Sequence, residues 1–369
     1  MSRPDAGLVG AAEPRTYRRT MLEHATGDSL NREGEPVTGL PLPSGHPLPS
    51  GHGLSWQPMT VADNGELVAL LTRVEAYDDP PYRTTAEESA EAFAQVAADI
   101  GSARVIGRDA DGIPRAYVIV RVRPTNGTVR ALWDGGVDPQ WRRRGIGAAL
   151  LDWQLSVTRA ILAGSGHDGA IAVVHVEESM ADAQEMLEAA GFTATRWYTE
   201  MRRDLSLEIP QVELSSRLSV EPWDPALDDA VRRAHNDAFK DQWGAELHTP
   251  ETWVQGRTYF APSWSFVALD RTSDRARVAG YLISGRYEGD WPAQGWTEGY
   301  TEILGVRTEW RGMRVATALL TAAMQAYAAD GMEYAGLGVD FSEPGGNYGL
   351  FGQLGYEPTR GSLLFTRTI

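Results

Sequence analysis

The chain has 369 residues, enough for two ordinary domains, and 42% of them are hydrophobic. Its formal net charge of −16 argues against nucleic-acid binding, which needs clustered positive charge. Cysteine is absent, which excludes disulfides, thiolate metal sites and a cysteine nucleophile, and we expect no metal site. The sequence holds neither an apolar run of membrane-spanning length nor the apolar core of an export signal near its start. We therefore expect a cytoplasmic protein with no membrane partner.

The first part of the chain, residues 1–53, is poor in large apolar residues and rich in proline and glycine. It contains a direct duplication, PLPSGH, at 41–46 and again at 47–52. Such a segment buries too little apolar surface to offset its ordering entropy, so we predict a disordered leader.

The rest of the chain contains an internal repeat. Val137–Arg142 (VDPQWR) is echoed by Val306–Arg311 (VRTEWR), and Leu187–Phe192 (LEAAGF) by Phe351–Tyr356 (FGQLGY). The two offsets, 169 (306 − 137) and 164 (351 − 187), differ by one small insertion or deletion. Repeats in the same order along the chain indicate two copies of one fold.

Each copy has the same expected order of elements. A strand and helical segments (about 62–99 and 225–257) precede a β-hairpin, a third strand, an amphipathic helix and a strand–helix–strand ending. This order predicts an α/β fold with a mixed sheet covered by helices on both faces. We predict domains at 54–205 and 218–369, joined by a linker at 206–217.

The most informative motif lies between the third strand and the following helix of the first copy. A helix N-terminus offers unpaired N–H groups and the positive end of a dipole, glycines permit close approach of a phosphate, and arginines add charge. The predicted anion-binding loop consists of Arg142, Arg143, Arg144, Gly145, Ile146, Gly147 and Ala148. It matches neither a Walker A loop nor a dinucleotide-binding fingerprint.

The order Arg-x-x-Gly-x-Gly after a valine-ended strand resembles the acyl-CoA pyrophosphate loop of the GNAT superfamily of N-acetyltransferases. The segment GLGVDFSEPGGNYGLFGQLGYEP at 336–358 looks like the motif that follows the fifth strand in these enzymes. The doubled architecture over residues 54–369 is similar to tandem GNAT proteins such as mycothiol synthase, in which only the C-terminal half is catalytic.

The resemblance implies acetyl transfer from acetyl-CoA to the primary amine of a small molecule, such as an amino sugar, within a ternary complex. It places the oxyanion-binding N–H groups at Val137 and Val306. The corresponding cofactor loop of the second copy is Arg311, Gly312, Met313, Arg314, Val315, Ala316 and Thr317. An alkyl amine has a pKa of about 10, so the enzyme must remove a proton from it.

The second copy provides the best candidate for this base. Glu302 lies four residues before Val306, and strand alternation predicts that it shares a face with Leu304 and Val306. A carboxylate on a largely buried strand suits a general base, and a salt bridge to Arg286 is the alternative.

Both copies depart from the family pattern. In the first copy, Leu187 occupies the position of the usual tyrosine acid and Trp133 that of Glu302, leaving Asp134 and His175 as titratable alternatives. In the second, Phe351 replaces the tyrosine and Arg314 a loop glycine, with Tyr348 or Tyr356 as substitutes and Glu343 where asparagine is usual. Two alternatives follow: an acyl-CoA-binding protein without activity, or catalysis in the N-terminal copy.

Overall fold

The computed structural model describes residues 45–80, 82–91, 93, 99–125, 128–240, 247–254, 257–341 and 348–369. Contacts group these residues into two compact units. The N-terminal unit comprises described residues of 45–195 together with 362–369, and the C-terminal unit those of 196–361. The predicted leader lies mostly outside the described residues.

The N-terminal unit is a six-stranded sheet in the order β1-β2-β3-β4-β5-β12. All neighbours are antiparallel except β4 and β5, which run parallel. Its elements are β1 (Ser55–Pro58), α2 (Asn64–Asp78), α3 (Ala86–Glu91), β2 (Gly101–Arg108), β3 (Pro114–Thr125), β4 (Thr128–Val137), α4 (Ile146–Ser165), β5 (Ile171–Glu177), α5 (Ala181–Ala189) and the end of β12 (Glu357–Thr368).

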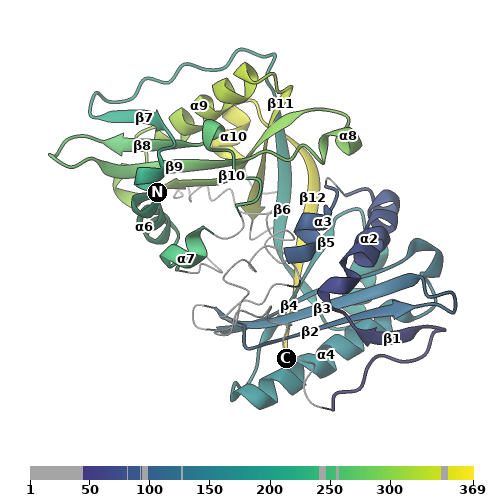
Figure 1. Ribbon diagram of the computed structural model, residues 1–369. Coiled ribbons are helices and arrows are strands. Elements are labelled where there is room, and N and C mark those ends of the chain that lie inside the picture. Colours follow the sequence, from purple (N-terminus) through teal and green to yellow (C-terminus); the bar gives the residue numbers. More distant parts are fainter. Residues whose placement is uncertain are drawn as a thin grey trace, which may run out of the picture. The chain divides into compact units, whose positions relative to one another are not determined.

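Strand alternation decides which helix covers each face of this sheet. Val118 and Val120 on β3 pack with residues of α4, whereas Tyr117 and Ile119 pack with leucines of α2. Figure 1 shows α4 and α2 on opposite sides of β2, β3 and β4. The predicted mixed sheet with helices on both faces is confirmed.

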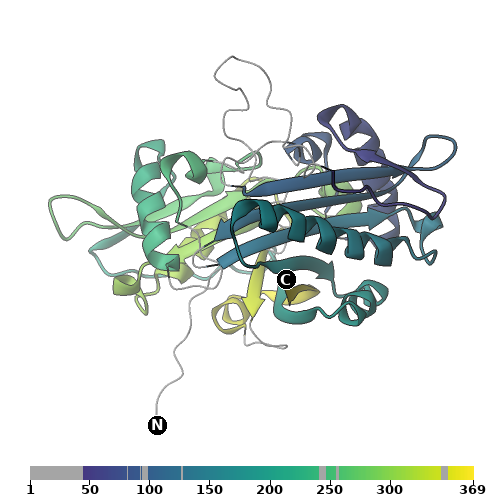
Figure 2. The same ribbon diagram turned by 90° about the horizontal axis from the view of Figure 1, so that it is seen from below.

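The C-terminal unit repeats this plan in the order β6-β11-β10-β9-β8-β7, with β10 parallel to β11. Helix α9 covers one face, and α6 covers the other (Figure 2). The elements are the end of β6 (Thr193–Asp204), β7 (Leu218–Pro222), α6 (Asp228–Phe239), α7 (Pro250–Trp253), β8 (Phe266–Asp270), β9 (Arg277–Gly285), α8 (Trp291–Gln294), β10 (Glu298–Val306), α9 (Val315–Ala329), β11 (Tyr334–Phe341) and α10 (Gly349–Gln353).

The two units exchange strand segments at their ends. Residues 197–204 of β6 pair with β11 in the C-terminal unit, and residues 362–368 of β12 pair with β5 in the N-terminal unit. Unpaired backbone groups at a strand edge need partners, and each unit obtains them from the end of the other repeat. The contact-defined units therefore differ from the repeat-based ranges 54–205 and 218–369 at these segments.

The last residues of the predicted leader pack on the N-terminal unit. The Trp153 indole donates to the Pro47 carbonyl at 2.8 Å, and Leu48 packs against the α4 core. A buried indole N–H needs an acceptor, and Pro47 supplies it. The ordered part of the unit thus begins before residue 54.

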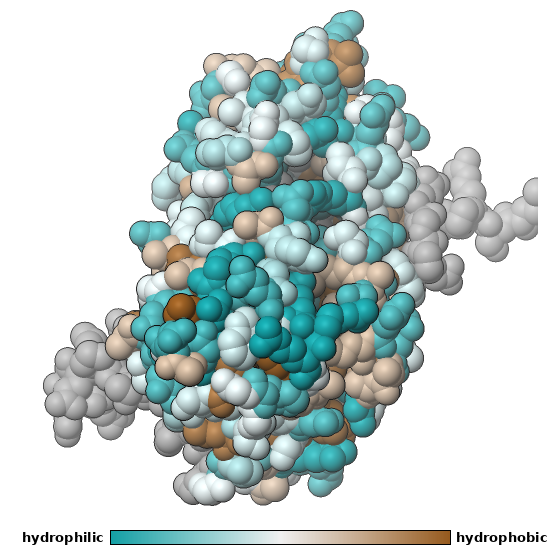
Figure 3. Space-filling view, turned by 90° about the vertical axis from the view of Figure 1, so that its right-hand side faces the viewer, coloured by the Kyte–Doolittle hydropathy of each residue, from teal (hydrophilic) through white to brown (hydrophobic). Residues whose placement is uncertain are grey.

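The exposed apolar side chains of the described residues are scattered. Figure 3 shows a face on which hydrophilic residues dominate and hydrophobic ones form small separate groups. The large exposed apolar side chains are Val61, Tyr77, Ile113, Leu207, Leu247, Val254 and Met313. Scattered apolar residues are normal for a protein surface and do not indicate a docking face.

The strand exchange predicts a long-range effect on stability. Phe365 is 1% exposed and lies in the core of the N-terminal unit. Phe365→Ala should reduce the free energy of unfolding of that unit by about 3–5 kcal/mol. Amide hydrogen exchange should accelerate in β4 and β5 but not in β8 and β9. If amide hydrogen exchange accelerated only in the C-terminal unit, the end of β12 would not belong to the N-terminal unit, and the strand exchange would be contradicted.

Candidate active site

In each unit, two parallel strands pair over a short length and then separate. In the C-terminal unit, β10 and β11 pair only between residues 298–301 and 334–337, although β10 continues to Val306. In the N-terminal unit, β4 and β5 pair between residues 130–132 and 171–173, although β4 continues to Val137. Past these points one edge of β4 and of β10 has no strand partner, and we call this unpaired stretch the gap.

The N–H groups of Val137 and Val306 point toward this gap. Asp138 N–H donates to Arg115 O on β3, and Arg307 N–H donates to Ala279 O on β9. Successive N–H groups along a strand point to opposite sides, so the N–H of the preceding valine points away from the antiparallel partner. Both predicted oxyanion donors therefore have the orientation that this role requires.

The first arginine of each loop binds the end of the strand that precedes the loop. Arg142 Nε donates to Val137 O at 3.1 Å, and both terminal nitrogens of Arg142 bind Asp78 at 2.6 Å. Arg311 Nε likewise donates to Val306 O at 3.3 Å. A bidentate carboxylate already engages the Arg142 guanidinium, so we assign this residue to holding the loop against the strand end.

The other two arginines of the first loop project into solvent. Arg143 and Arg144 are exposed, and Arg144 stacks on the Trp141 ring at 4.5 Å. After them, Ala149 N–H donates to Gly145 O, so the N–H groups of the helix's first turn precede its first hydrogen bond. Free N–H groups, a helix dipole and two exposed guanidinium groups fit a diphosphate.

The two loops follow the same backbone path but place glycine differently. Each has two residues in the left-handed region: Arg143 (φ 61°) and Gly145 (φ 80°) in one, Gly312 (φ 76°) and Arg314 (φ 63°) in the other. Gly145 and Arg314 cap the N-termini of α4 and α9, as their sequence alignment predicted. Arg314 is thus accommodated at a conformational cost.

Removing that cost should stabilise the protein. Arg314→Gly relieves a left-handed arginine, which costs roughly 1–2 kcal/mol, but adds the chain entropy of glycine. We expect a net gain of about 0.5–1 kcal/mol in the unfolding free energy, measured by urea denaturation. Arg311→Gly, at a residue with φ −65°, is the matched control and should destabilise. A loss of stability in Arg314→Gly would contradict the assigned strain.

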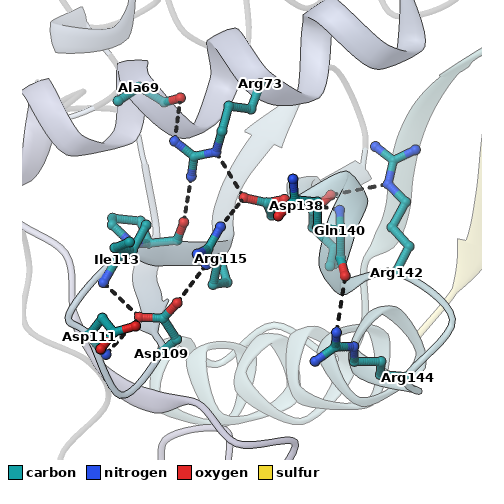
Figure 4. Close-up of polar contacts among 12 residues, drawn as sticks. Ala69, Arg73, Asp109, Asp111, Ile113, Arg115, Asp138, Gln140, Arg142 and Arg144 are labelled. Carbon is teal, nitrogen blue, oxygen red and sulfur yellow. Dashed lines mark hydrogen bonds and ion pairs between the residues drawn. The ribbon is translucent and has the colours of Figure 1, made fainter.

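Asp138 organises the start of the first loop (Figure 4). Its carboxylate accepts from Arg73 at 2.8 Å, from Arg115 at 2.9 Å and from the Gln140 N–H at 3.0 Å. Burial alone would raise the pKa of Asp138, but these donors outweigh it and hold the pKa below its ordinary value. The loop is therefore anchored to α2 and β3 through one charged side chain.

Asp138→Asn should destabilise the N-terminal unit at neutral pH. We expect a loss of about 1–2 kcal/mol, moderated because the Arg73 side chain is 37% exposed and screened by solvent. Since the folded-state pKa is lowered, this stabilisation is present above pH ~4 and is lost as pH falls through the folded pKa. Urea unfolding at several pH values measures it. Asp182→Asn, at a 72%-exposed side chain, should have no effect at any pH.

The predicted face of Glu302 was wrong. Strands β9 and β10 pair Ser284 with Thr301 and Ile283 with Ile303, so Glu302 is an extra residue in a β-bulge. A bulge places two consecutive side chains on one face. Leu304 and Val306 face α9, whereas Glu302 lies with Ile303 on the α6 face.

Contacts of Glu302 support this placement. A Cβ built at Gly285 would meet the Glu302 carboxylate, and Gly285 continues the α6-facing alternation of Tyr281 and Ile283. The Tyr287 hydroxyl donates a hydrogen bond to Glu302 Oε1. The expected alternative partner, Arg286, instead binds Glu288 at 2.6 Å and Asp330 at 3.6 Å.

The N-terminal unit lacks this bulge. Strand β4 pairs with β3 without a register shift, and Trp133 points to α4, where its indole donates to Thr158 at 3.0 Å. Thr301 makes the corresponding contact with Tyr327, 169 residues later (327 − 158), at 3.2 Å. Trp133 therefore matches Thr301, and the prediction that it matches Glu302 was wrong.

The positions of the usual tyrosine acid are filled by core residues. Leu187 and Phe351 are each 2% exposed. Burial raises the pKa of Tyr356 far above its usual range, and its side chain packs on Phe351 in the core, which removes it as a substitute. Tyr348 is half-buried beside Phe341 and remains a candidate. Glu343 lies outside the described residues.

The alternative bases of the N-terminal unit are differently placed. Asp134 is half-buried on the α2 face of β4 and accepts from the Tyr117 hydroxyl at 3.1 Å. His175 is half-buried on β5. Gly136 is needed because the Tyr117 ring lies 2.7 Å from where its Cβ would be.

The helical region before the second hairpin holds an aromatic cluster. His235 on α6 stacks on Phe239 and lies near Trp253. Its Nδ1 forms a hydrogen bond with the Tyr281 hydroxyl. Burial and the nearby His248 lower the pKa of His235 to about 3, so its ring is neutral at pH 7. Gln242, Trp243 and Gly244, which follow α6 in the sequence, lie outside the described residues.

The described residues hold no grouping of three or more His, Asp or Glu side chains suited to a metal ion. Within the same residues, no helix combines the length and apolarity needed to cross a membrane.

Comparisons with known proteins agree with this geometry. Residues 56–192 match the acetyltransferase (GNAT) family. The chain is 26% identical over 258 residues to a mycothiol acetyltransferase of Rhodococcus opacus (strain B4), covering 68% of this chain and 78% of that protein. It is 28% identical over 229 residues to a mycothiol acetyltransferase of Gordonia bronchialis, covering 59% and 68%.

Solved structures share the fold. A GCN5-related N-acetyltransferase from Sphaerobacter thermophilus superposes with a TM-score of 0.67 at 20% identity, over 87% of this chain and 97% of that chain. A tandem GNAT protein from the clavulanic acid biosynthesis pathway gives 0.60 at 18% identity, over 85% and 98%. The family match over residues 56–192 and these likenesses support a protein with the tandem GNAT fold and N-acetyltransferase activity. Members of this family take their acyl group from an acyl-CoA.

Proposed function

We propose that the C-terminal unit transfers an acetyl group from acetyl-CoA to the primary amine of a small molecule, such as an amino sugar. The observation that carries this proposal is the bulge at Glu302. It turns a carboxylate onto the α6 face, next to the gap that the Val306 N–H faces. A proton acceptor and an oxyanion donor thus serve one reacting centre from neighbouring positions.

Residues of this unit supply the groups that the reaction needs. Glu302 accepts a proton from the acceptor's ammonium group, directly or through a water, and the neutral amine then attacks the thioester carbonyl. The C–N bond forms, the C–S bond breaks and CoA leaves as its thiolate. The Tyr287 hydroxyl, bonded to Glu302 Oε1, orients the carboxylate. The Val306 N–H binds the developing oxyanion. The loop from Arg311 to Thr317 and the start of α9 hold the diphosphate.

The acceptor face of the unit suits a cation. Glu298 is 4% exposed on β10, and a Cβ at Gly336 would come within 2.9 Å of its Oε2 and 3.0 Å of the Tyr300 ring. The Tyr300 hydroxyl donates to both Glu200 carboxylate oxygens at 3.1 Å. Carboxylates and aromatic rings together favour an ammonium group. The similar mycothiol acetyltransferases also support a small acceptor.

One observation favours a second function. Phe351 and Leu187 fill the tyrosine-acid positions of both units. An acyl-CoA-binding protein without turnover is consistent with these apolar residues. Binding of acetyl-CoA without CoA release over a panel of amines would support that function.

The proposal predicts a specific effect of Glu302→Gln. We expect kcat to fall about 10²–10⁴-fold, because a general base contributes this much, while acetyl-CoA affinity stays unchanged. CoA release with a thiol reagent and calorimetric titration measure the two quantities. Glu309→Gln, at a 57%-exposed side chain of the same unit, is the matched control and should keep full activity.

A variant of the other loop identifies the catalytic unit. Gly145 has a φ of 80°, and His52 Cε1 lies 3.2 Å from where its Cβ would be, so Gly145→Arg should distort the first loop. If activity survives Glu302→Gln and is lost in Gly145→Arg, catalysis lies in the N-terminal unit and the proposal is wrong.

A further inference from the structure

The end of the leader contacts the first cofactor loop through His52. The Leu54 N–H donates to the Gly51 carbonyl at 3.2 Å, which closes a turn around His52. The His52 Nδ1 lies 2.8 Å from the carbonyl oxygen of Arg144, 92 residues further along the chain. A carbonyl oxygen only accepts a hydrogen bond, so the imidazole donates it from Nδ1. A segment just before β1 thus holds the backbone of the loop that follows β4.

The contact continues to the residue that caps α4. A Cβ built at Gly145 would lie 3.2 Å from His52 Cε1, so the ring packs directly on the Gly145 backbone. His52 itself has a left-handed φ of 58°, which costs free energy in a residue with a Cβ. Such a conformation persists where surrounding contacts hold it. For His52 these contacts are the turn at Gly51 and the carbonyl of Arg144.

The hydrogen bond to Arg144 fixes the direction of the next N–H group. Arg144 O and Gly145 N–H belong to one planar trans peptide group, in which they point in opposite directions. His52 holds the oxygen, so the Gly145 N–H points away from the imidazole. Among the described residues this N–H donates to no acceptor. It is therefore available to an anion, together with the N–H groups of the first turn of α4.

The C-terminal unit has the same turn but not the same hydrogen bond. The Leu218 N–H donates to Ser215 O at 2.8 Å, as in the turn before β1. The equivalent of Arg144 is Met313, 169 residues later (313 − 144). Arg217 places a terminal nitrogen 3.1 Å from the sulfur of Met313, and within the described part of the chain no donor binds the Met313 carbonyl. The fixed peptide group thus belongs to the N-terminal unit.

We propose that His52 is a positioning residue for the first cofactor loop, which orients the Gly145 N–H toward the diphosphate of acetyl-CoA. A peptide group that is held before binding loses less conformational freedom when the ligand arrives, so affinity rises without a new contact to the ligand. His52 acts through the Arg144 carbonyl. The inference rests on acetyl-CoA as the cofactor, but it is independent of which unit transfers the acetyl group.

Calorimetric titration of the full chain with acetyl-CoA tests this role. Gly145→Arg first identifies the binding event that belongs to the first loop. His52→Ala should weaken that event about three- to tenfold, the worth of one net hydrogen bond, and leave binding to the C-terminal unit unchanged. His52→Asn should stay within about twofold of the wild type, because its amide N–H can reach the same carbonyl and asparagine tolerates a left-handed φ.

The duplicated sequence provides a matched control. His46 is the histidine of the first PLPSGH copy, and its ring packs edge-on against Trp153 on α4 with the ring centroids 6.0 Å apart. His46→Ala removes a contact between the same segment and the same helix, away from the loop. It should lower Tm and leave the affinity for acetyl-CoA unchanged. A purely structural role of His52 would make the two alanine variants alike.

Four results would overturn the proposal. Unchanged affinity in His52→Ala would show that the histidine only stabilises the segment, and tighter binding would show that it obstructs the loop. An asparagine variant as weak as the alanine variant would show that the hydrogen bond is not responsible. If Gly145→Arg changes no binding event, the first loop does not hold acetyl-CoA. If the wild type shows no binding event at all, the proposed function fails as well.

Discussion

The separation of two parallel strands is the constraint on which the rest of the site depends. Strands β10 and β11 stop pairing after Thr301, which leaves backbone N–H groups of β10 without a strand partner on that side. Such groups need a hydrogen-bond partner when buried, and a ligand lying along the strand can provide it. After Val306 the chain passes through a 3-10 helix (Thr308–Trp310) and a short loop to the N-terminus of α9 at Val315. In the proposed function, the gap, the N–H groups and the helix dipole form one site.

The bulge in β10 determines which face of the sheet carries the Glu302 carboxylate, the proposed proton acceptor. A single extra residue reverses the facing of every side chain before it relative to those after it. Glu302 consequently stands on the face opposite Leu304 and Val306, where a carboxylate reaches an acceptor without displacing the core under α9. Strand β4 has no register shift and places Trp133 in the core under α4 of the N-terminal unit. The proposed difference in function between the two units thus has a local cause, although their folds are alike.

Much of this could be predicted from the sequence. The repeat, the mixed sheet, the valine-ended strands and the position of Arg314 against Gly145 all follow from local patterns, and the structure agrees with them. The bulge at Glu302 could not be predicted. Side chains along a strand are expected to alternate strictly between the two faces, and no glycine or proline at Glu302 signals an exception. The exchange of strand segments at β6 and β12 could not be predicted from the sequence either, because local propensity does not specify which distant strand a residue pairs with. The burial of arginines such as Arg121, which is 1% exposed, could not be predicted either. Of the chain's 34 basic residues 33 are arginine, so no single arginine stands out in the sequence.

The central claim is that the C-terminal unit presents the reacting centre between β10 and β11. A structure of the full chain with acetyl-CoA bound tests it most directly. We expect the thioester oxygen within hydrogen-bond distance of the Val306 N–H, and the Glu302 carboxylate on the α6 side of the thioester. Acetyl-CoA found in the N-terminal unit alone, with the gap between β10 and β11 empty at saturating cofactor, would contradict the account.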